Sequence, residues 1–217
     1  SMKMKHTINQ MTILALITAG LMTGCAKNPA DAVPEAKAST PGDAETSEVA
    51  ADAVKYVIDS GSTIKFVGAK VTGQHAGGFN EFTGYFHISK GELTGSDHKL
   101  TIDMESTWSD AEKLTSHLKN EDFFNVAKYP EAVFELKSVT GAQEGTTRTL
   151  VGDLDFHGVR KQLEIDADVT EKDGVLSIQS EFSLDRFAFD IVYPGKKDNL
   201  IKQNVLVSID ITAKPEK

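Results

Sequence analysis

Apolar and polar residues alternate through most of this chain from Tyr56 onward. Polar residues separate the apolar ones in the run Leu163, Ile165, Ala167 and Val169. A period of two places every second side chain on one face of a strand, so these segments predict strands with one buried face. The same pattern occurs in the segments 63–66, 100–105, 150–156, 176–184 and 205–211.

The connections favour an antiparallel arrangement. Asp173-Gly174 is a strong hairpin signal, and other glycines separate the remaining apolar runs. The segment from Asp110 to Asn120 carries Leu114 and Leu118 four residues apart, which predicts one helix with Asp110 as N-cap. One helix among about eight strands gives no alternation of strands and helices, which disfavours a parallel sheet and leaves a barrel or a sandwich. An eight-stranded barrel can hold one small ligand inside.

Aromatic residues define the folding unit. All 11 Phe, all 4 Tyr and the single Trp follow residue 55. The predicted domain therefore covers residues 56–217, which is 217 − 56 + 1 = 162 positions. A chain of that size buries roughly 70% of the surface that its unfolded form exposes, so it needs no disulfide.

The first residues are typical of an export signal. Lys3 and Lys5 precede an apolar run from Met11 to Met22, which is shorter than the ~20 residues that span a bilayer. The sequence Leu21-Met22-Thr23-Gly24-Cys25 resembles the lipobox of bacterial lipoproteins. That resemblance implies a signal peptide over residues 1–24 and a lipidated Cys25.

Residues 25–55 are predicted to be a disordered acidic tether. Between 26 and 54 there are nine Ala and three Pro, and acidic residues outnumber lysines by 6 to 2. Such a composition offers little apolar area to offset the entropy of ordering. The absence of Asp after Cys25 favours the outer membrane, with the domain facing the periplasm.

Charge and cysteine content exclude several classes of function. A formal net charge of −9 disfavours nucleic acid as a partner. One cysteine cannot form an internal disulfide or a multi-cysteine zinc site. Residues 56–217 hold 18 basic and 26 acidic residues. Such a field opposes pyrophosphate headgroups and anionic membrane surfaces, and it favours a neutral, quinone-like headgroup on any lipid ligand.

Several short motifs of the domain resemble the YceI-like family of bacterial periplasmic proteins, over nearly all of residues 56–217. The most specific are the run 114–124 and Tyr129-Pro130-Glu131-Ala132-Val133-Phe134. The others are 56–59, 62–66, His75, 77–79, 82–84, 152–154, 158–159, 186–187 and 204–205. The resemblance implies a lipocalin-like barrel with a hydrophobic tunnel, a long isoprenoid or similar amphiphile as ligand, and a homodimer.

The candidate ligand-binding residues are large and apolar, with two polar ones at the mouth. Packing within a solid core is the alternative role for each apolar residue. The full set is Phe66, Phe79, Phe82, Phe86, Met104, Trp108, His117, Leu118, Phe123, Phe124, Phe134, Phe156, Phe182, Arg186 and Phe187. His117 is expected to orient a headgroup or close the mouth, and Arg186 to pair with Asp190 or with a ligand.

No signature of catalysis or of a metal site accompanies this set. His75, His117 and His157 have no second histidine three to five residues away, and no nucleophile elbow or phosphate loop occurs. The sequence therefore predicts a non-enzymatic, lipid-anchored protein that carries an isoprenoid in an eight-stranded antiparallel barrel, with no catalytic residue, metal or other cofactor. An enzyme acting on a small lipid or stress metabolite, and a solidly filled structural barrel, are the alternatives.

Overall fold

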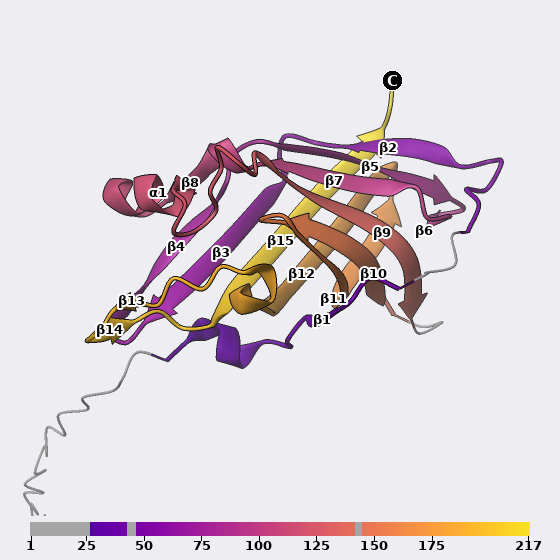
Figure 1. Ribbon diagram of the computed structural model, residues 1–217. Helices are drawn as coiled ribbons and strands as arrows, with labels where there is room; N and C mark the ends of the chain where they lie inside the picture. The colour runs from indigo at the N-terminus through magenta and orange to yellow at the C-terminus, as the bar shows by residue number, and fades with distance from the viewer. Residues whose placement is uncertain (1–26, 43–46, 142–144) are drawn as a thin grey trace, which may run out of the picture.

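The computed structural model describes residues 27–42, 47–141 and 145–217, and it is a closed antiparallel barrel (Figure 1). Eight strands pair in the cyclic order β11-β10-β9-β7-β5-β2-β15-β12 and back to β11. Their bounds are β2 (Val54–Ile58), β5 (Phe82–Ser89), β7 (His98–Asp103), β9 (Glu131–Gly141), β10 (Thr147–Phe156), β11 (Val159–Lys172), β12 (Val175–Asp185) and β15 (Asn204–Pro215). The predicted eight-stranded all-β barrel is confirmed.

Strand β11 shows why the alternation predicted the fold well. Leu163, Ile165, Ala167 and Val169 are buried, whereas the residues between them are half-buried or exposed. The hairpin to β12 turns at Asp173 and Gly174, where both φ angles are positive (55° and 76°). Two successive positive φ angles are what a tight hairpin of this type requires.

One side of the barrel splits into a flared end. The end of β15, at Ala213–Pro215, pairs with β2, but its earlier part, residues 206–210, pairs with β3 (Thr63–Lys70). Strand β3 then continues through β4 (Gly73–Phe79) to β8 (Thr107–Ser109), away from the closed circuit. The barrel is therefore wider at the end toward which β3 runs, and we call this end the mouth.

The short elements gather mostly at the mouth (Figure 1). The single helix, α1 (Glu112–Lys119), follows β8, and the hairpin of β13 (Gly195–Lys196) and β14 (Asn199–Leu200) lies at the same end. The remaining elements are η1 (Pro29–Ala32), β1 (Lys37–Ser39), β6 (Glu92–Leu93), η2 (Met104–Ser106) and η3 (Arg186–Phe189). The helix is confirmed, but its N-cap is Ala111, not Asp110, because the Asp110 carboxylate binds the ring of His75 and the amide of Ala76 instead.

The opposite end of the barrel is filled by a packed core. Leu176 and Ala213 have no exposed surface there, and Ile211 and Ile178 are almost as deeply buried. These residues belong to one cluster with Phe86, Leu150 and Val169. Side chains therefore fill the interior at this end, and the open space lies toward the mouth.

The prediction of a disordered tether is wrong for residues 27–42. β11 pairs with β12 only over residues 168–172, and beyond that the two strands separate. Residues 34–39 lie in this gap: β1 pairs with residues 162–164 of β11, while Ser183 of β12 exchanges backbone hydrogen bonds of 2.8 and 2.9 Å with Pro34 and Ala36. Backbone N–H and C=O groups at a strand edge need hydrogen-bond partners, and the small, buried Ala36 fits between the two strands. Amino-acid composition does not reveal such pairing, so it did not predict that this segment is ordered. We call residues 34–39 the seam strand.

The signal peptide, Cys25 and residues 26 and 43–46 of the predicted tether lie outside the described residues. None of the helices in the described part of the chain is long and apolar enough to cross a membrane.

Candidate functional site

A cavity of about 630 Å³ occupies the barrel between the packed core and the mouth. Its volume lies within the ~300–1,000 Å³ that small-ligand sites usually have. Its walls are mostly apolar and include residues of β3, β4, β5, β7, β9, β10, β11, β12 and β15. Among the described residues that line it, none is an aspartate or a glutamate, although the chain has 32 acidic residues.

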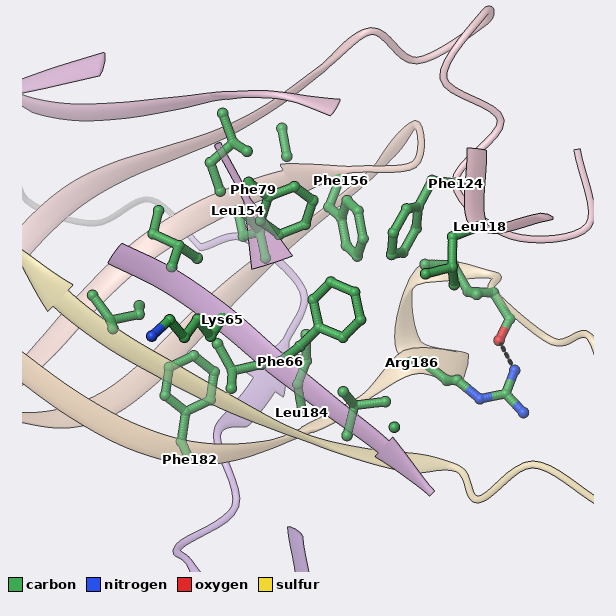
Figure 2. A pocket seen from close by; sticks show the side chains of 18 of the residues that line it. Lys65, Phe66, Phe79, Leu118, Phe124, Leu154, Phe156, Phe182, Leu184 and Arg186 are labelled. Atoms are coloured by element: carbon green, nitrogen blue, oxygen red, sulfur yellow. Dashed lines mark hydrogen bonds between the residues drawn. The ribbon is translucent and has the colours of Figure 1, made fainter. Parts of the chain in front are cut away.

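Four phenylalanines from different elements meet across the cavity (Figure 2). The ring of Phe66 lies 5.8 Å from Phe79 and 6.2 Å from Phe124, and Phe124 lies 5.7 Å from Phe156, centroid to centroid. The tilted and edge-on geometries are those that aromatic pairs prefer. Gly77 makes room for this group, because a Cβ there would lie 2.4 Å from the Phe66 ring.

Twelve of the fifteen predicted ligand-binding residues line this cavity. They are Phe66, Phe79, Phe86, Met104, His117, Leu118, Phe123, Phe124, Phe134, Phe156, Phe182 and Arg186. Their contact with a ligand stays a prediction. The fold brings them to one cavity wall although they lie up to 120 positions apart in the sequence.

The other three predicted residues do not line the cavity. Phe82 packs on the outer part of the core, and together with Trp108 it borders a separate hollow near residues 58–65. Trp108 lies against Gly78, whose Cβ position is 3.0 Å from the indole nitrogen. Phe187 is 40% exposed, under the guanidinium of Arg186. Residue type alone did not show on which side of the wall these rings lie.

Selecting aromatic residues also missed much of the wall. Aliphatic side chains of the inward strand faces also line the cavity, among them Leu154, Leu163, Ile165, Leu184 and Val207. The period-two pattern already marked their faces as buried, so the strand phase was the signal that could have found them. Two lysines of the mouth, Lys70 and Lys113, were missed as well.

Helix α1 and the segment after it cover part of the mouth. The ring of His117 lies 5.0 Å from Phe123 and 5.1 Å from Tyr193, and its Nε2 is 2.9 Å from a carboxylate oxygen of Asp122. Leu118 and Phe123 are buried beneath it. His117 therefore links the helix to the loop that carries Tyr193, next to the opening.

Arg186 holds that loop in place and does not pair with Asp190. Its side chain is 5% exposed. It donates hydrogen bonds to the carbonyl oxygens of Ile191, Ile201 (3.4 Å) and Lys202 (3.0 Å). Burial lowers the pKa of Arg186, against the effect of Asp185, yet a guanidinium stays charged at neutral pH. Figure 2 shows Arg186 at the edge of the cavity, beside Leu118 and Leu184.

The described histidines make no metal site. Among residues 27–42, 47–141 and 145–217, no group of three His, Cys, Asp or Glu side chains is placed to hold an ion. His75 binds Asp110 at 2.7 Å, and Nδ1 of His157 lies 2.9 Å from the carbonyl oxygen of Phe189. Each of these rings already has a structural partner.

A fourth histidine, His98, was not singled out in the sequence and is the most deeply buried of the histidines that the structure describes. It is 2% exposed, it lines the cavity, and burial lowers its pKa from the ordinary 6.5. Its Nδ1 accepts a hydrogen bond from the amide of His87 (3.1 Å), and its Nε2 donates to the carbonyl of Gly95 (3.0 Å). This arrangement needs the neutral ring with the proton on Nε2.

The lowered pKa of His98 predicts that stability falls on acidification. Below about pH 6.5 the unfolded chain binds a proton at His98 that the folded chain refuses, so the free energy of unfolding decreases as the pH drops from 7.5 to 5.5. Most carboxylates remain ionised over this range. Urea unfolding at both pH values should show a smaller decrease in His98→Gln than in the unchanged chain, and an equal decrease would contradict this role.

Comparison with known proteins agrees with the barrel fold. The family model of the YceI-like domain matches residues 56–213. Protein YceI of Escherichia coli is 32% identical over 127 residues, which cover 56% of this chain and 63% of that protein. A UPF0312 protein of Vibrio parahaemolyticus is 31% identical over 124 residues, covering 54% and 64%. The chain thus spans less than two thirds of the length of these relatives.

Two solved structures share the fold. BcnA of Burkholderia cenocepacia superposes with a TM-score of 0.62 at 19% identity, over 72% of this chain and 99% of that one. A polyisoprenoid-binding domain from Saccharophagus degradans, implicated in plant cell wall breakdown, gives 0.62 at 17% identity, over 75% and 99%. At such identities the likeness concerns the fold.

Proposed function

We propose that this chain, which belongs to the YceI-like family, binds a long-chain isoprenoid or a similar amphiphilic lipid inside its barrel. The observation that carries the proposal is the apolar cavity of about 630 Å³, closed by a packed core at one end and open at the other. A cavity that is closed at one end suits a lipid whose apolar tail enters first and whose headgroup stays at the open mouth. The polyisoprenoid-binding description of a protein with the same fold supports the same ligand class.

Energetics favour carriage or sequestration of such a lipid. Burying one five-carbon isoprene unit from water contributes at most roughly 4 kcal/mol, at ~0.8 kcal/mol per methylene. A bilayer solvates the same tail equally well, so transfer out of a membrane gains little from the tail. Selectivity must then come from the shape of the cavity and from contacts with the headgroup.

The headgroup contacts available at the mouth include several hydrogen-bond donors. Lys70, Lys113 and Lys196 line this end, and no described carboxylate does. Such donors suit acceptor oxygens, including the two carbonyls of a quinone, which is the headgroup we propose. The excess of acidic residues over residues 56–217 disfavours a pyrophosphate at long range, although the local lysines act in the opposite direction.

A binding role fits the lining better than catalysis. Ser180 is the one serine among the described lining residues, and its hydroxyl donates to the carbonyl of Asp166 (2.6 Å). His98 uses both ring nitrogens in backbone hydrogen bonds.

We further propose that Cys25 anchors the protein in the bacterial envelope, facing the periplasm from the outer membrane.

Plugging the cavity at Gly68 tests the proposal. Gly68 lines the cavity, and a Cβ added there meets no atom within 4 Å, so the ring of Gly68→Phe can enter the empty space. Gly73, in the same hairpin but outside the cavity lining, is equally free of contacts, which makes Gly73→Phe the matched control. We expect native mass spectrometry of protein from its bacterial host to show at least tenfold less bound lipid in Gly68→Phe only.

The mass of the bound molecule identifies the headgroup. A quinone supports the proposal in full, whereas a polyprenyl phosphate supports isoprenoid binding and contradicts the quinone headgroup. Equal lipid content in both variants, or none in the unchanged protein, would contradict binding in this cavity. Conversion of an added lipid that is lost in His117→Ala, with lipid retention unchanged, would favour the enzymatic alternative.

A further inference from the structure

Large apolar side chains are exposed around the mouth. Among the described residues five are exposed, and four of them, Val71, Phe187, Val192 and Leu200, directly adjoin in the sequence a residue that lines the cavity. Val192, between Ile191 and Tyr193, is 58% exposed. We call these four residues the rim patch. The fifth, Val54, begins β2 and adjoins no lining residue.

The rim patch is held together by backbone hydrogen bonds. The amide of Val71 donates to the carbonyl of Leu200 (3.1 Å), which joins the end of β3 to β14. The buried Arg186 binds the carbonyls of Ile191 and Ile201, next to Val192 and Leu200, and stacks on Phe187 at 4.6 Å. The exposed apolar side chains therefore lie on a fixed support.

Basic residues accompany the patch. Lys196, Lys197 and Lys202 are exposed on the same loop, and Lys70 precedes Val71. Residues 186–203 contain four basic and two acidic residues, a local charge of 4 − 2 = +2 in a chain of −9. Apolar side chains interspersed with lysines are the composition that attaches proteins to anionic lipid surfaces.

The described chain also begins at this end. The side chain of Asn28 donates to the carbonyl of Asn204 (3.0 Å), at the start of β15, and Ala30 is 1% exposed. Cys25, the predicted lipidation site, precedes Asn28 by three residues in the sequence. The predicted lipidation site is therefore three residues from a side chain that is fixed at the mouth.

We infer that the rim patch docks on an anionic phospholipid surface, with the mouth of the cavity facing the bilayer. In that position a lipid tail passes from the membrane into the barrel without crossing water. The inference goes beyond lipid binding in the cavity, because it concerns the outer surface, and docking can occur whether or not the cavity is filled.

Site-specific labels test the orientation in the full chain. Cys25 is the single cysteine, so a Cys25→Ser background allows one new label and removes the acylation site. Leu200→Cys reports on the patch and Val54→Cys is the matched control, each carrying an environment-sensitive fluorophore. With vesicles of phosphatidylethanolamine and phosphatidylglycerol at 3:1, we expect the Leu200 label to brighten about threefold and to be quenched by spin-labelled lipid.

Two further variants remove the attachment without touching the cavity. Val192→Asp and Lys197→Glu should each reduce vesicle binding about tenfold, and raised salt should weaken binding of the unchanged chain. Equal responses of the two labels, or vesicle binding unchanged in both variants, would overturn the inference. A Leu200 response without vesicles, accompanied by a dimer in sedimentation, would also overturn it, because a second copy would then cover the patch. Bound lipid measured separately by mass spectrometry distinguishes failure of docking from failure of the cavity.

Discussion

Replacing Arg186 with methionine is expected to lower the free energy of unfolding by about 3 kcal/mol. Methionine keeps most of the apolar volume but leaves three carbonyl oxygens without their donor. A hydrogen bond to a charged group contributes ~1.5–3 kcal/mol, and the losses at one site are not additive. Urea unfolding followed by circular dichroism measures the effect.

The loop that Arg186 supports should also open more often. Its carbonyl partners lie at residues 191, 201 and 202, on both arms of the segment that borders the mouth. Hydrogen exchange at residues 191–202 should therefore accelerate in Arg186→Met more than exchange in β10 or β11. Lys202→Met, an exposed change in the same loop, is the control and should leave both readouts within error.

Arg186→Lys separates charge from geometry. A single ammonium lacks the planar fork that reaches several acceptors at once, so this variant should recover only part of the stability. If Arg186→Met unfolds at the same urea concentration as Lys202→Met, Arg186 has no structural role at the mouth and its contacts with the loop contribute nothing measurable.

The barrel could be predicted from the sequence because its strands obey a strictly local rule. In β11 the alternation of Leu163, Ile165 and Ala167 marks both the strand and its inward face, whichever strands become its neighbours. The Asp173-Gly174 turn likewise depends on local backbone angles. These features do not need knowledge of distant contacts.

The features that the sequence did not predict depend on distant contacts. An arginine between strands suggested a carboxylate partner, but Arg186 binds carbonyls up to 16 residues away, which carry no residue-type signal. Trp108 and Phe187 are of the residue types that line lipid pockets, yet their positions in the fold place their side chains outside the cavity lining. The lysines of the mouth are ordinary surface residues until the fold brings them to one opening.

The N-terminal segment shows the same limit in energetic terms. Its alanines and prolines offer little apolar area, and the expectation of disorder rested on that fact. The composition says nothing about the strands that lie beside the segment in the fold. The splaying of β11 from β12 leaves the edges at residues 162–164 and Ser183 in need of backbone partners, and the seam strand supplies them. Order in this segment is a property of the gap that it fills.

Replacing Ala36 with aspartate is therefore expected to destabilise the barrel by about 3 kcal/mol. Ala36 is 5% exposed and packs with the barrel core, so a carboxylate there loses its hydration or forces the seam strand out. Ala38, two residues on in β1, is exposed, and Ala38→Asp should change stability by no more than about 0.5 kcal/mol. Urea unfolding of the two variants gives the comparison.

Displacing the seam strand should also affect the cavity, because this strand lies between two strands that line it. Leu163 and Ile165 of β11 and Phe182 and Leu184 of β12 line the cavity on either side of the seam strand. Displacement of that strand in Ala36→Asp should therefore expose the cavity laterally and accelerate hydrogen exchange at residues 162–164 and Ser183, whereas Ala38→Asp should leave both edges protected. Identical exchange and stability in the two variants would mean that residues 34–39 do not stay in the wall in solution, and that the disordered tether inferred from composition describes them after all.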